Sequence, residues 1–531
     1  MNPLAGTGQL VRLALRRDRV VVPVWVLVLG VLPAAIAATY EQFYPDAASR
    51  SSLTTGAAAN PSVTLLYGPA FDLSTAGGFT AWRILAFLSL FTALACVFTV
   101  TRHTRQEEDT GRQELLSSAV LGRFAALTAA LLVAGAAALT TGLVAVITLV
   151  ATGMPAAGSV AFGLGIASTG WVFSAVAAVT AQLVEYSRTA NGLASAVLGL
   201  AFLVRGVGDS AKDVSWLSWL SPLGWAPQLR AFAGERWAVV LLPLAATVVL
   251  CGLAYGLLPR RDVGLSIFPS RPGPATAAPG LRSPLALAWR LHRGTLTGWL
   301  VGFAVMGAVL GSLASGIGGL VGDSPQIRQV FERMGGTSAL VDSYLGAIAG
   351  IFGMVAAVFA VQANLRMRSE ETGFRLEPLL ATPVRRLRWA ASHLVFSLLG
   401  SALLLVVAGV AAGLLHGLRV GDVGGQVPRV LGATVAQLPA VWVVAGISVL
   451  LFGIVPKAAT AGWSVASLSL AIALYGPALR LPQAVLDVSP FTHVPKLPTA
   501  TLTVTPLVWL SGIALIALVA GLAGFRRRDI G

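Results

Sequence analysis

Two short charged segments are the places where this otherwise apolar chain could bind another molecule. They are residues 105–123 and 369–388, each set between long apolar runs. Each reads acid, acid, Thr, Gly, and then an acid with a pair of leucines. A charge run usually marks a solvated connector, but two copies at matching places favour a functional surface. We call these segments the first and second islands.

The islands match residue by residue, with small slips around Pro378. The matching residues are Glu108, Asp109, Thr110, Gly111, Glu114, Leu115 and Leu116 in the first, and Glu370, Glu371, Thr372, Gly373, Glu377, Leu379 and Leu380 in the second. The glycines can end a helix, and either threonine can cap a new short one. Thr110 with Gln113 fits a capping box. Each short helix would then present a leucine pair flanked by charge.

Catalytic motifs are missing from the sequence. The three lysines, at 212, 457 and 496, lie outside any Gly-Lys-Ser or Gly-Lys-Thr motif, so a phosphate-binding P-loop is not possible. ATP hydrolysis, if it is used, therefore belongs to another chain. No Ser-His-acid or zinc-protease pattern is present, and the five histidines are not at metal-ligand spacing. We expect no enzymatic activity, no metal and no cofactor in this chain.

Composition places the chain in a membrane. Hydrophobic residues make up 56% and charged residues 11%, whereas soluble domains carry roughly 25% charged residues. Apolar runs of about 20 residues recur, which is the length a helix needs to span the hydrocarbon core. Twelve spans are predicted, near residues 20–40, 79–101, 124–151, 160–183, 191–206, 237–258, 296–316, 345–365, 389–415, 432–455, 459–477 and 504–524.

Landmarks recur in the same order in both halves. An amphipathic segment precedes the first span at 5–18 and the seventh at 285–293, and a Ser-Pro segment that dips into the outer interface recurs at 214–227 and 486–496. Each half closes on Arg-Arg-Asp. An even number of spans per half makes the halves parallel repeats. We predict an all-α membrane protein of twelve transmembrane helices in two parallel six-helix repeats, with short cytoplasmic helices and outer re-entrant segments.

The predicted domains are a first half at 1–264, a flexible cytoplasmic linker at 265–283 and a second half at 284–531. Basic residues concentrate in the segments that this layout places inside, which puts both termini in the cytoplasm of a multi-pass plasma-membrane protein. The first span lacks a convincing cleavage site, so we expect a retained helix. Topology and contact with anionic lipid explain the basic charge, and nucleic acid is not needed.

The middles of the spans hold almost no ionisable residues. Carriers driven by protons or sodium usually keep such residues near mid-membrane, because these groups carry the coupling. The pattern therefore favours a permease that an outside motor drives. An ion-coupled secondary carrier and a membrane enzyme acting on lipid remain alternatives.

In its order of surface helix, two spans, Glu-Glu-Thr-Gly element, further spans and outer Ser-Pro segment, the chain resembles the type-2 ABC exporter permeases. The fused two-by-six layout most resembles the actinobacterial permeases of polyketide-antibiotic (tetronasin-type) exporters. This resemblance implies two copies of a separate cytoplasmic ABC ATPase, which hold ATP and Mg. It also implies that each island is the coupling helix. The residues so assigned are Glu107, Glu108, Thr110, Gly111, Glu114, Leu115, Leu116, Glu370, Glu371, Thr372, Gly373, Glu377, Leu379 and Leu380.

The resemblance further implies that the second and fifth spans of each half line the cargo path. The aromatic residues placed there are Phe87, Phe91, Phe98, Phe352 and Phe359, although ordinary helix packing explains their spacing more simply. An apolar path suits export of hydrophobic or amphiphilic compounds, such as polyketide antibiotics and drugs, and so multidrug efflux. A lipid-exporting ABC permease is the alternative.

Overall fold

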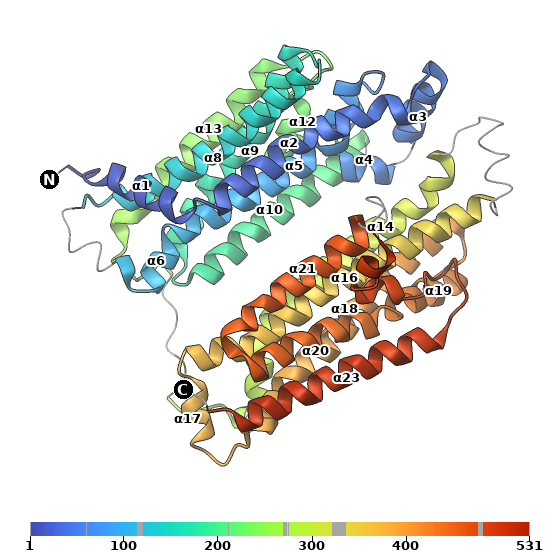
Figure 1. The fold of residues 1–531 in the computed structure, drawn as a ribbon. Helices are drawn as coiled ribbons and strands as arrows, with labels where there is room; N and C mark the ends of the chain where they lie inside the picture. The colour runs from blue at the N-terminus through green and yellow to red at the C-terminus, as the bar shows by residue number, and fades with distance from the viewer. Residues whose placement is uncertain are drawn as a thin grey trace. The chain divides into compact units, whose positions relative to one another are not determined.

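The computed structural model describes residues 2–59, 61–113, 121–210, 212–268, 273, 275–320, 336–475 and 482–529. In this part of the chain all regular structure is helical, which confirms an all-α membrane protein. The chain divides into two compact units, Met1–Gly273 and Pro274–Gly531, each a bundle of long helices (Figure 1).

Unit 1 is built from long apolar helices with short helices at their ends. The helices are α1 (Thr7–Arg17), α2 (Val21–Phe43), α3 (Ala47–Ala59), α4 (Pro61–Tyr67), α5 (Ala76–Arg102), α6 (Arg105–Asp109), α8 (Ala125–Ala151), α9 (Ala156–Leu183), α10 (Ser187–Ser210), α11 (Leu217–Leu220), α12 (Pro222–Gln228) and α13 (Leu241–Leu257). Short 3₁₀ helices are Lys212–Val214, Trp237–Val240 and Leu258–Arg260.

Helix α9 forms the centre of unit 1. It packs against α5, α8 and α13, and its Phe162 and Phe173 side chains are fully buried. Small residues let the backbones of α8 and α9 touch, since a Cβ built on Gly163 would lie 2.6 Å from the carbonyl oxygen of Gly142. Such contacts between small residues are typical of helix packing in membranes, where burial of apolar surface does not drive association.

Unit 2 is also built from long apolar helices with short helices at their ends, and its three longest helices have 37, 37 and 35 residues. The helices are α14 (Pro284–Leu320), α16 (Gly336–Thr372), α17 (Leu376–Leu380), α18 (Arg386–Val420), α19 (Val423–Val435), α20 (Leu438–Ile454), α21 (Gly462–Tyr475), α22 (Gln483–Leu486) and α23 (Val504–Arg527), with 3₁₀ helices at Pro279–Leu281, Pro456–Ala461 and Pro490–His493. Helix α14 lies along α18 and α20 lies along α23. Gly453 and Gly521 meet backbone to backbone where α20 and α23 cross.

Eleven helices in the described residues are long and apolar enough to cross a membrane. The span predicted at 459–477 differs, because α21 has 14 residues and a crossing needs about 20. The end of this predicted span lies outside the described residues. The twelve-span layout therefore stays a prediction.

The two Ser-Pro segments make the same contact in both units. The hydroxyl of Ser221 donates to the carbonyl oxygen of Ala201 at 2.6 Å, and that of Ser489 donates to Ser469 at 2.9 Å. In each case the acceptor lies 20 residues earlier, on α10 in unit 1 and on α21 in unit 2. This shared contact supports an internal duplication.

Two local expectations are wrong. The amphipathic segment at 285–293 is not a separate surface helix like α1, because it forms the first turns of the continuous helix α14. The predicted linker is not a free tether from residue 265, because its first residues are hydrogen-bonded to unit 1. Ile267 N–H donates to the carbonyl oxygen of Gln182 at 3.2 Å. We call residues 262–268 the strap.

Candidate functional site

The first island begins just after α5, at the end of unit 1 where α1 and α6 lie (Figure 1). Thr110 caps the C-terminus of α6, and its hydroxyl donates to the carbonyl oxygens of Gln106 at 3.0 Å and Glu107 at 3.3 Å. Gly111 comes next with a φ of 70°, a conformation that favours glycine. Thr110 therefore ends α6, and its role in capping the next helix stays a prediction, because residues 114–120 lie outside the described residues.

The remaining predicted residues of the first island, Glu114, Leu115 and Leu116, lie outside the described residues. The described parts of this island are residues 105–113, which hold three of its four acids, and residues 121–123.

Both glutamates of α6 are largely buried ion-pair partners. Glu107 pairs with Arg17 of α1, and Glu108 pairs with Arg105 one helical turn earlier. Arg261 donates from its two Nη atoms to the two oxygens of Glu108, both at 2.7 Å. A two-pronged arginine–carboxylate bond of this kind is strong and directional. It fixes α6 to the chain that leaves the last long helix of unit 1.

The strap completes this arrangement. Arg105 is fully buried, and its Nη2 donates to the carbonyl oxygen of Leu265 at 2.8 Å. Arg261 Nε donates to the side chain of Gln182 at 2.7 Å, near the end of α9. The first island, the end of α9 and the strap are therefore joined through two buried guanidinium groups.

A further set of ion pairs connects α1 to the end of unit 1 at which the first island lies. Asp18 is buried just after α1, where it lies 2.8 Å from Arg102 and 2.6 Å from the imidazole Nε2 of His103. With the pair between Arg17 and Glu107, this set holds the surface helix against the end of α5 and α6. The predicted amphipathic helix is thus attached to the island.

In the second island the long helix α16 continues through both acids and ends at Thr372. Glu370 forms ion pairs with Arg366 and Arg375, each at 2.9 Å. Arg528 donates to the two oxygens of Glu371 at 2.6 and 2.9 Å. Both carboxylates are buried, as in the first island.

These contacts decide how the two islands correspond. Glu108 bonds to Arg261, and Glu371 bonds to Arg528, in the two Arg-Arg-Asp endings of the units. Glu108 is therefore the equivalent of Glu371, not of Glu370 as the sequence match suggested. We call each of these pairs a Glu–Arg clamp.

The turn after α16 differs from the expected one. The hydroxyl of Thr372 donates back to the carbonyl oxygen of Arg368 at 2.9 Å, so Thr372 belongs to α16 and does not cap α17. The left-handed residue is Phe374, with a φ of 54°, and not Gly373. This places the Phe374 ring in the open, where 71% of the residue is exposed.

Helix α17 carries the leucines of the second island. Leu376 is fully buried, and Leu379 and Leu380 pack half-buried against a cluster that includes Trp389. Glu377 is exposed. The leucine pair is therefore largely used within unit 2, and Phe374, which the repeated sequence pattern did not single out, is the apolar side chain that this island exposes most.

The predicted aromatic residues of the cargo path lie in two different environments. Phe91 and Phe98 are each 43% exposed on α5, and Phe87 contacts the Tyr67 ring edge-on at 5.8 Å. Phe352 and Phe359 are 2% and 1% exposed in the core of unit 2. The two on α16 therefore act in packing within unit 2, and Phe91 and Phe98 remain candidates for contact with cargo or lipid.

Each island contains buried carboxylates that join the end of one long helix to the end of another. Among the described residues, no group of three or more His, Cys, Asp or Glu side chains could hold a metal ion.

Comparison with known proteins agrees with a transport role. A family model described as the C-terminal domain of the multidrug efflux system permease Rv1217c matches residues 281–526. The multidrug efflux system permease protein Rv1217c of Mycobacterium tuberculosis (strain ATCC 25618 / H37Rv) is 46% identical over 526 residues, which cover 99% of this chain and 95% of the relative. With this identity over nearly its full length, and with its many membrane-spanning helices, the chain belongs to the family of multidrug efflux permeases that includes Rv1217c.

Proposed function

We propose that this chain is the membrane subunit of an ATP-driven ABC exporter. Two copies of a separate ATPase, which hold ATP and Mg, dock on the two islands, one copy on each. The cargo is a hydrophobic or amphiphilic compound, such as a drug or a polyketide antibiotic. The name of the relative Rv1217c, a multidrug efflux system permease, supports this cargo class.

The observation that carries the proposal is the Glu–Arg clamp built at equivalent places in both units. Glu108 with Arg261, and Glu371 with Arg528, join the segment after α5 or α16 to the segment after α13 or α23. A motor that pushes on an island would move two helix ends together. A flexible connector would absorb the same push, so the clamps favour a mechanical role for the islands.

The basic residues support a cytoplasmic position for both islands and both termini. The chain has 37 Lys and Arg against 22 Asp and Glu, and arginines stand in both islands and in both Arg-Arg-Asp endings. Positive segments between membrane helices remain on the cytoplasmic side. An ATPase in the cytoplasm could therefore reach both islands.

An ion-coupled carrier is the weaker alternative. Asp209 is a buried carboxylate near the end of α10, but it lies 3.3 Å from Arg205 and accepts a hydrogen bond from Ser218 at 2.6 Å. A carboxylate that binds and releases a coupling ion needs access and freedom. The contacts of Asp209 favour a structural role. Export of lipid uses the same architecture and stays the alternative cargo.

On the second island we expect Phe374 to be the main apolar contact with the ATPase. A buried aromatic ring contributes more contact area than most side chains, whereas exposed ion pairs contribute roughly 0–1 kcal/mol. The half-buried Leu379 and Leu380 support the island from within. The exposed Glu377 would then select and orient the partner.

Replacing Phe374 with Asn tests this docking surface. Asn tolerates the left-handed backbone that Phe374 adopts, so the ring is lost without added strain. We expect the variant to retain less ATPase, by at least roughly tenfold in affinity, because burying a large apolar side chain contributes about 1.5–3 kcal/mol. The measurement is the amount of ATPase that co-purifies with the tagged permease.

Phe43→Asn is the matched control. Phe43 is 70% exposed at the C-terminal end of α2, which is the end of unit 1 away from the first island (Figure 1). The control should retain the full amount of ATPase. Equal recovery of ATPase with both variants would contradict docking through Phe374, and absence of any ATPase with the wild-type chain would contradict the proposed function.

A further inference from the structure

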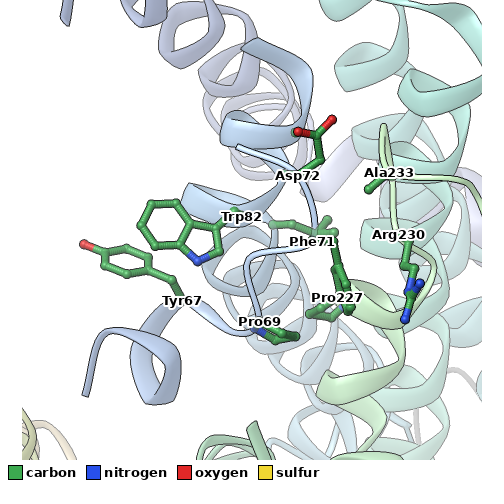
Figure 2. Close-up of a pocket in the computed structure, with 12 residues that line it drawn as sticks. Tyr67, Pro69, Phe71, Asp72, Trp82, Pro227, Arg230 and Ala233 are labelled. Atoms are coloured by element: carbon green, nitrogen blue, oxygen red, sulfur yellow. The ribbon is translucent and has the colours of Figure 1, made fainter. Parts of the chain in front are cut away.

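A hollow lies at the end of unit 1 that is away from the first island, between the start of α5 and the chain after α12 (Figure 2). Its walls include Tyr67, Phe71, Trp82, Pro227 and Arg230. The space that the centre of a water molecule can occupy is about 20 Å³, which is room for roughly one water. The hollow therefore has room for a group about the size of one water, such as one oxygen of an anionic head, and the rest of a ligand would lie outside it.

Arg230 brings a positive charge to this hollow without a protein counter-ion in the described residues. Its guanidinium lies 4.4 Å from the centre of the Phe71 ring, in a cation–π contact. Its Nε atom is buried and has no hydrogen-bond partner in the described part of the chain. Buried polar atoms of native proteins are nearly always paired, so the described part of the chain satisfies this guanidinium only in part.

The carboxylate that lines the same hollow, that of Asp72, forms no ion pair with Arg230 in the described residues. Asp72 accepts hydrogen bonds from the backbone N–H and the hydroxyl of Ser74, at 2.8 and 2.6 Å. Figure 2 shows its carboxylate pointing away from the Arg230 guanidinium. Burial and then the charge of Arg236 lower the pKa of Arg230, so the nearby charge that acts on it is another cation.

The backbone that carries Arg230 is held in an uncommon conformation. Arg230 and Phe232 have φ angles of 53° and 63°, in the left-handed region that residues other than glycine rarely adopt. The Phe232 ring is wedged between α5 and α9, since a Cβ built on Gly158 of α9 would overlap it. Such strain persists where the surroundings fix it, and it is concentrated at functional sites.

The opposite wall is also fixed. Arg205 is fully buried, and its Nη2 donates to the carbonyl oxygens of Leu65 and Leu66 at 2.6 and 2.9 Å, at the end of α4. The next residue is Tyr67, and Trp82 Nε1 donates to the carbonyl oxygen of Gly68 at 3.1 Å. The aromatic wall and the guanidinium are thus both held by the bundle before any ligand arrives.

From this arrangement we infer that the hollow binds the anionic head of an amphiphile, a carboxylate or phosphate joined to an apolar body. Because its Nε is buried, Arg230 would donate from its two Nη groups to two oxygens of the anion, a geometry for which guanidinium is suited. Phe71 and Trp82 would contact the first carbons of the apolar body. This binding requires no ATPase, so it can be tested on the permease alone.

The test is calorimetric titration of the full chain, purified in a neutral detergent, with decanoate and with decanol. These probes share an apolar body and differ in the charge of the head. We expect decanoate to bind at least about tenfold more tightly than decanol, because the charged head gains hydrogen bonds to a cation. In Arg230→Asn, which suits the left-handed backbone, the two probes should bind equally.

Two variants separate loss of the site from loss of the fold. Arg230→Lys keeps the charge but not the paired donors, so it should keep part of the preference for decanoate. Arg50→Asn removes a guanidinium that also stacks on an aromatic ring, at 5.3 Å from the centre of Tyr40, but that does not line the hollow. This control should keep the whole preference.

Short-chain phosphatidylglycerol, added as a competitor of decanoate, identifies the source of the anion. Competition that is lost in Arg230→Asn assigns the site to lipid phosphate as well as carboxylate. Absence of competition, with the decanoate preference intact, assigns it to free carboxylate amphiphiles. The inference is overturned if the wild-type chain does not prefer decanoate, or if Arg230→Asn prefers it as strongly as the wild type.

Discussion

Removing the carboxylate of Glu108 would leave two buried arginines without their main counter-ion. The side chains of Arg105 and Arg261 are 0% and 3% exposed. An uncompensated buried charge costs roughly 3–5 kcal/mol. We therefore expect Glu108→Ala to lower the temperature of thermal unfolding of the purified chain by several degrees, measured by tryptophan fluorescence in detergent.

Glu377→Ala is the control for this change, since Glu377 belongs to the other island and is exposed on α17. Surface substitutions of this kind usually change stability by less than about 0.5 kcal/mol. If Glu108→Ala and Glu377→Ala unfold at the same temperature, Glu108 is not part of a buried clamp.

At the scale of single residues, the sequence predicted which segments form the Glu–Arg clamps better than it predicted the contacts within the clamps. Both islands and both Arg-Arg-Asp endings stood out as repeated landmarks, but Glu108 and Arg261 are 153 positions apart in sequence. A single sequence does not show that two residues so far apart along the chain are in contact. Charge suggested exposure for these glutamates, whereas the arginines that pair with them offset the cost of burial. The exposed position of Phe374 depends on its backbone conformation, which composition does not reveal.

The helices of each unit approach one another through glycines, and this contact predicts opposite effects for two equivalent substitutions. Gly163→Ala places a methyl group 2.6 Å from the carbonyl oxygen of Gly142 on α8, so the two helices must separate. Gly199→Ala on α10 meets no atom within 4 Å. Replacing Gly with Ala inside a helix otherwise stabilises it by about 1 kcal/mol.

We expect Gly163→Ala to lower the unfolding temperature, because overpacking typically costs about 1–3 kcal/mol. Gly199→Ala should leave this temperature unchanged or raise it. Both are measured by the same thermal unfolding assay. A rise with Gly163→Ala would show that α8 and α9 do not touch at this point.

At the scale of helices, hydropathy predicted most of the described fold. The long apolar runs match α2, α5, α8, α9, α10, α14, α16, α18 and α23, because a helix in a membrane must satisfy its own backbone hydrogen bonds. Hydropathy could not predict where a helix is interrupted. Unit 1 breaks near Asp18, which ion pairs hold in place, whereas α14 runs on through the corresponding region.

At the scale of the whole chain, the strap changes the role of the connection between the two units. The strap, residues 262–268, comes before the rest of the linker. Hydrogen bonds from Arg105 and Arg261 to the carbonyl oxygen of Leu265 join the strap to the first island. The second island has a counterpart of Arg261 in Arg528, close to the end of the chain. Each island therefore has its own Glu–Arg clamp. Only the clamp of the first island is followed along the chain by the linker. A displacement of the first island would act on the linker directly.

This attachment predicts slow hydrogen exchange at the start of the linker. The N–H groups of Ile267 and Phe268 donate to the carbonyl oxygens of Gln182 and Leu183, both at 3.2 Å. Arg105→Met keeps the volume of the side chain but removes the donor that holds Leu265. We expect exchange at Ile267 and Phe268 to become faster by at least roughly tenfold, since a hydrogen bond to a charged group contributes about 1.5–3 kcal/mol.

Arg123→Met is the control, because Arg123 also donates to a backbone carbonyl of this connection, that of Pro259 at 2.8 Å, but before the strap begins. It should leave exchange at Ile267 and Phe268 unchanged. Residues 275–278, farther along the linker, should exchange fast in every variant. If Ile267 and Phe268 already exchange as fast as residues 275–278 in the wild-type chain, the strap is not attached, and the linker would not move with the first island.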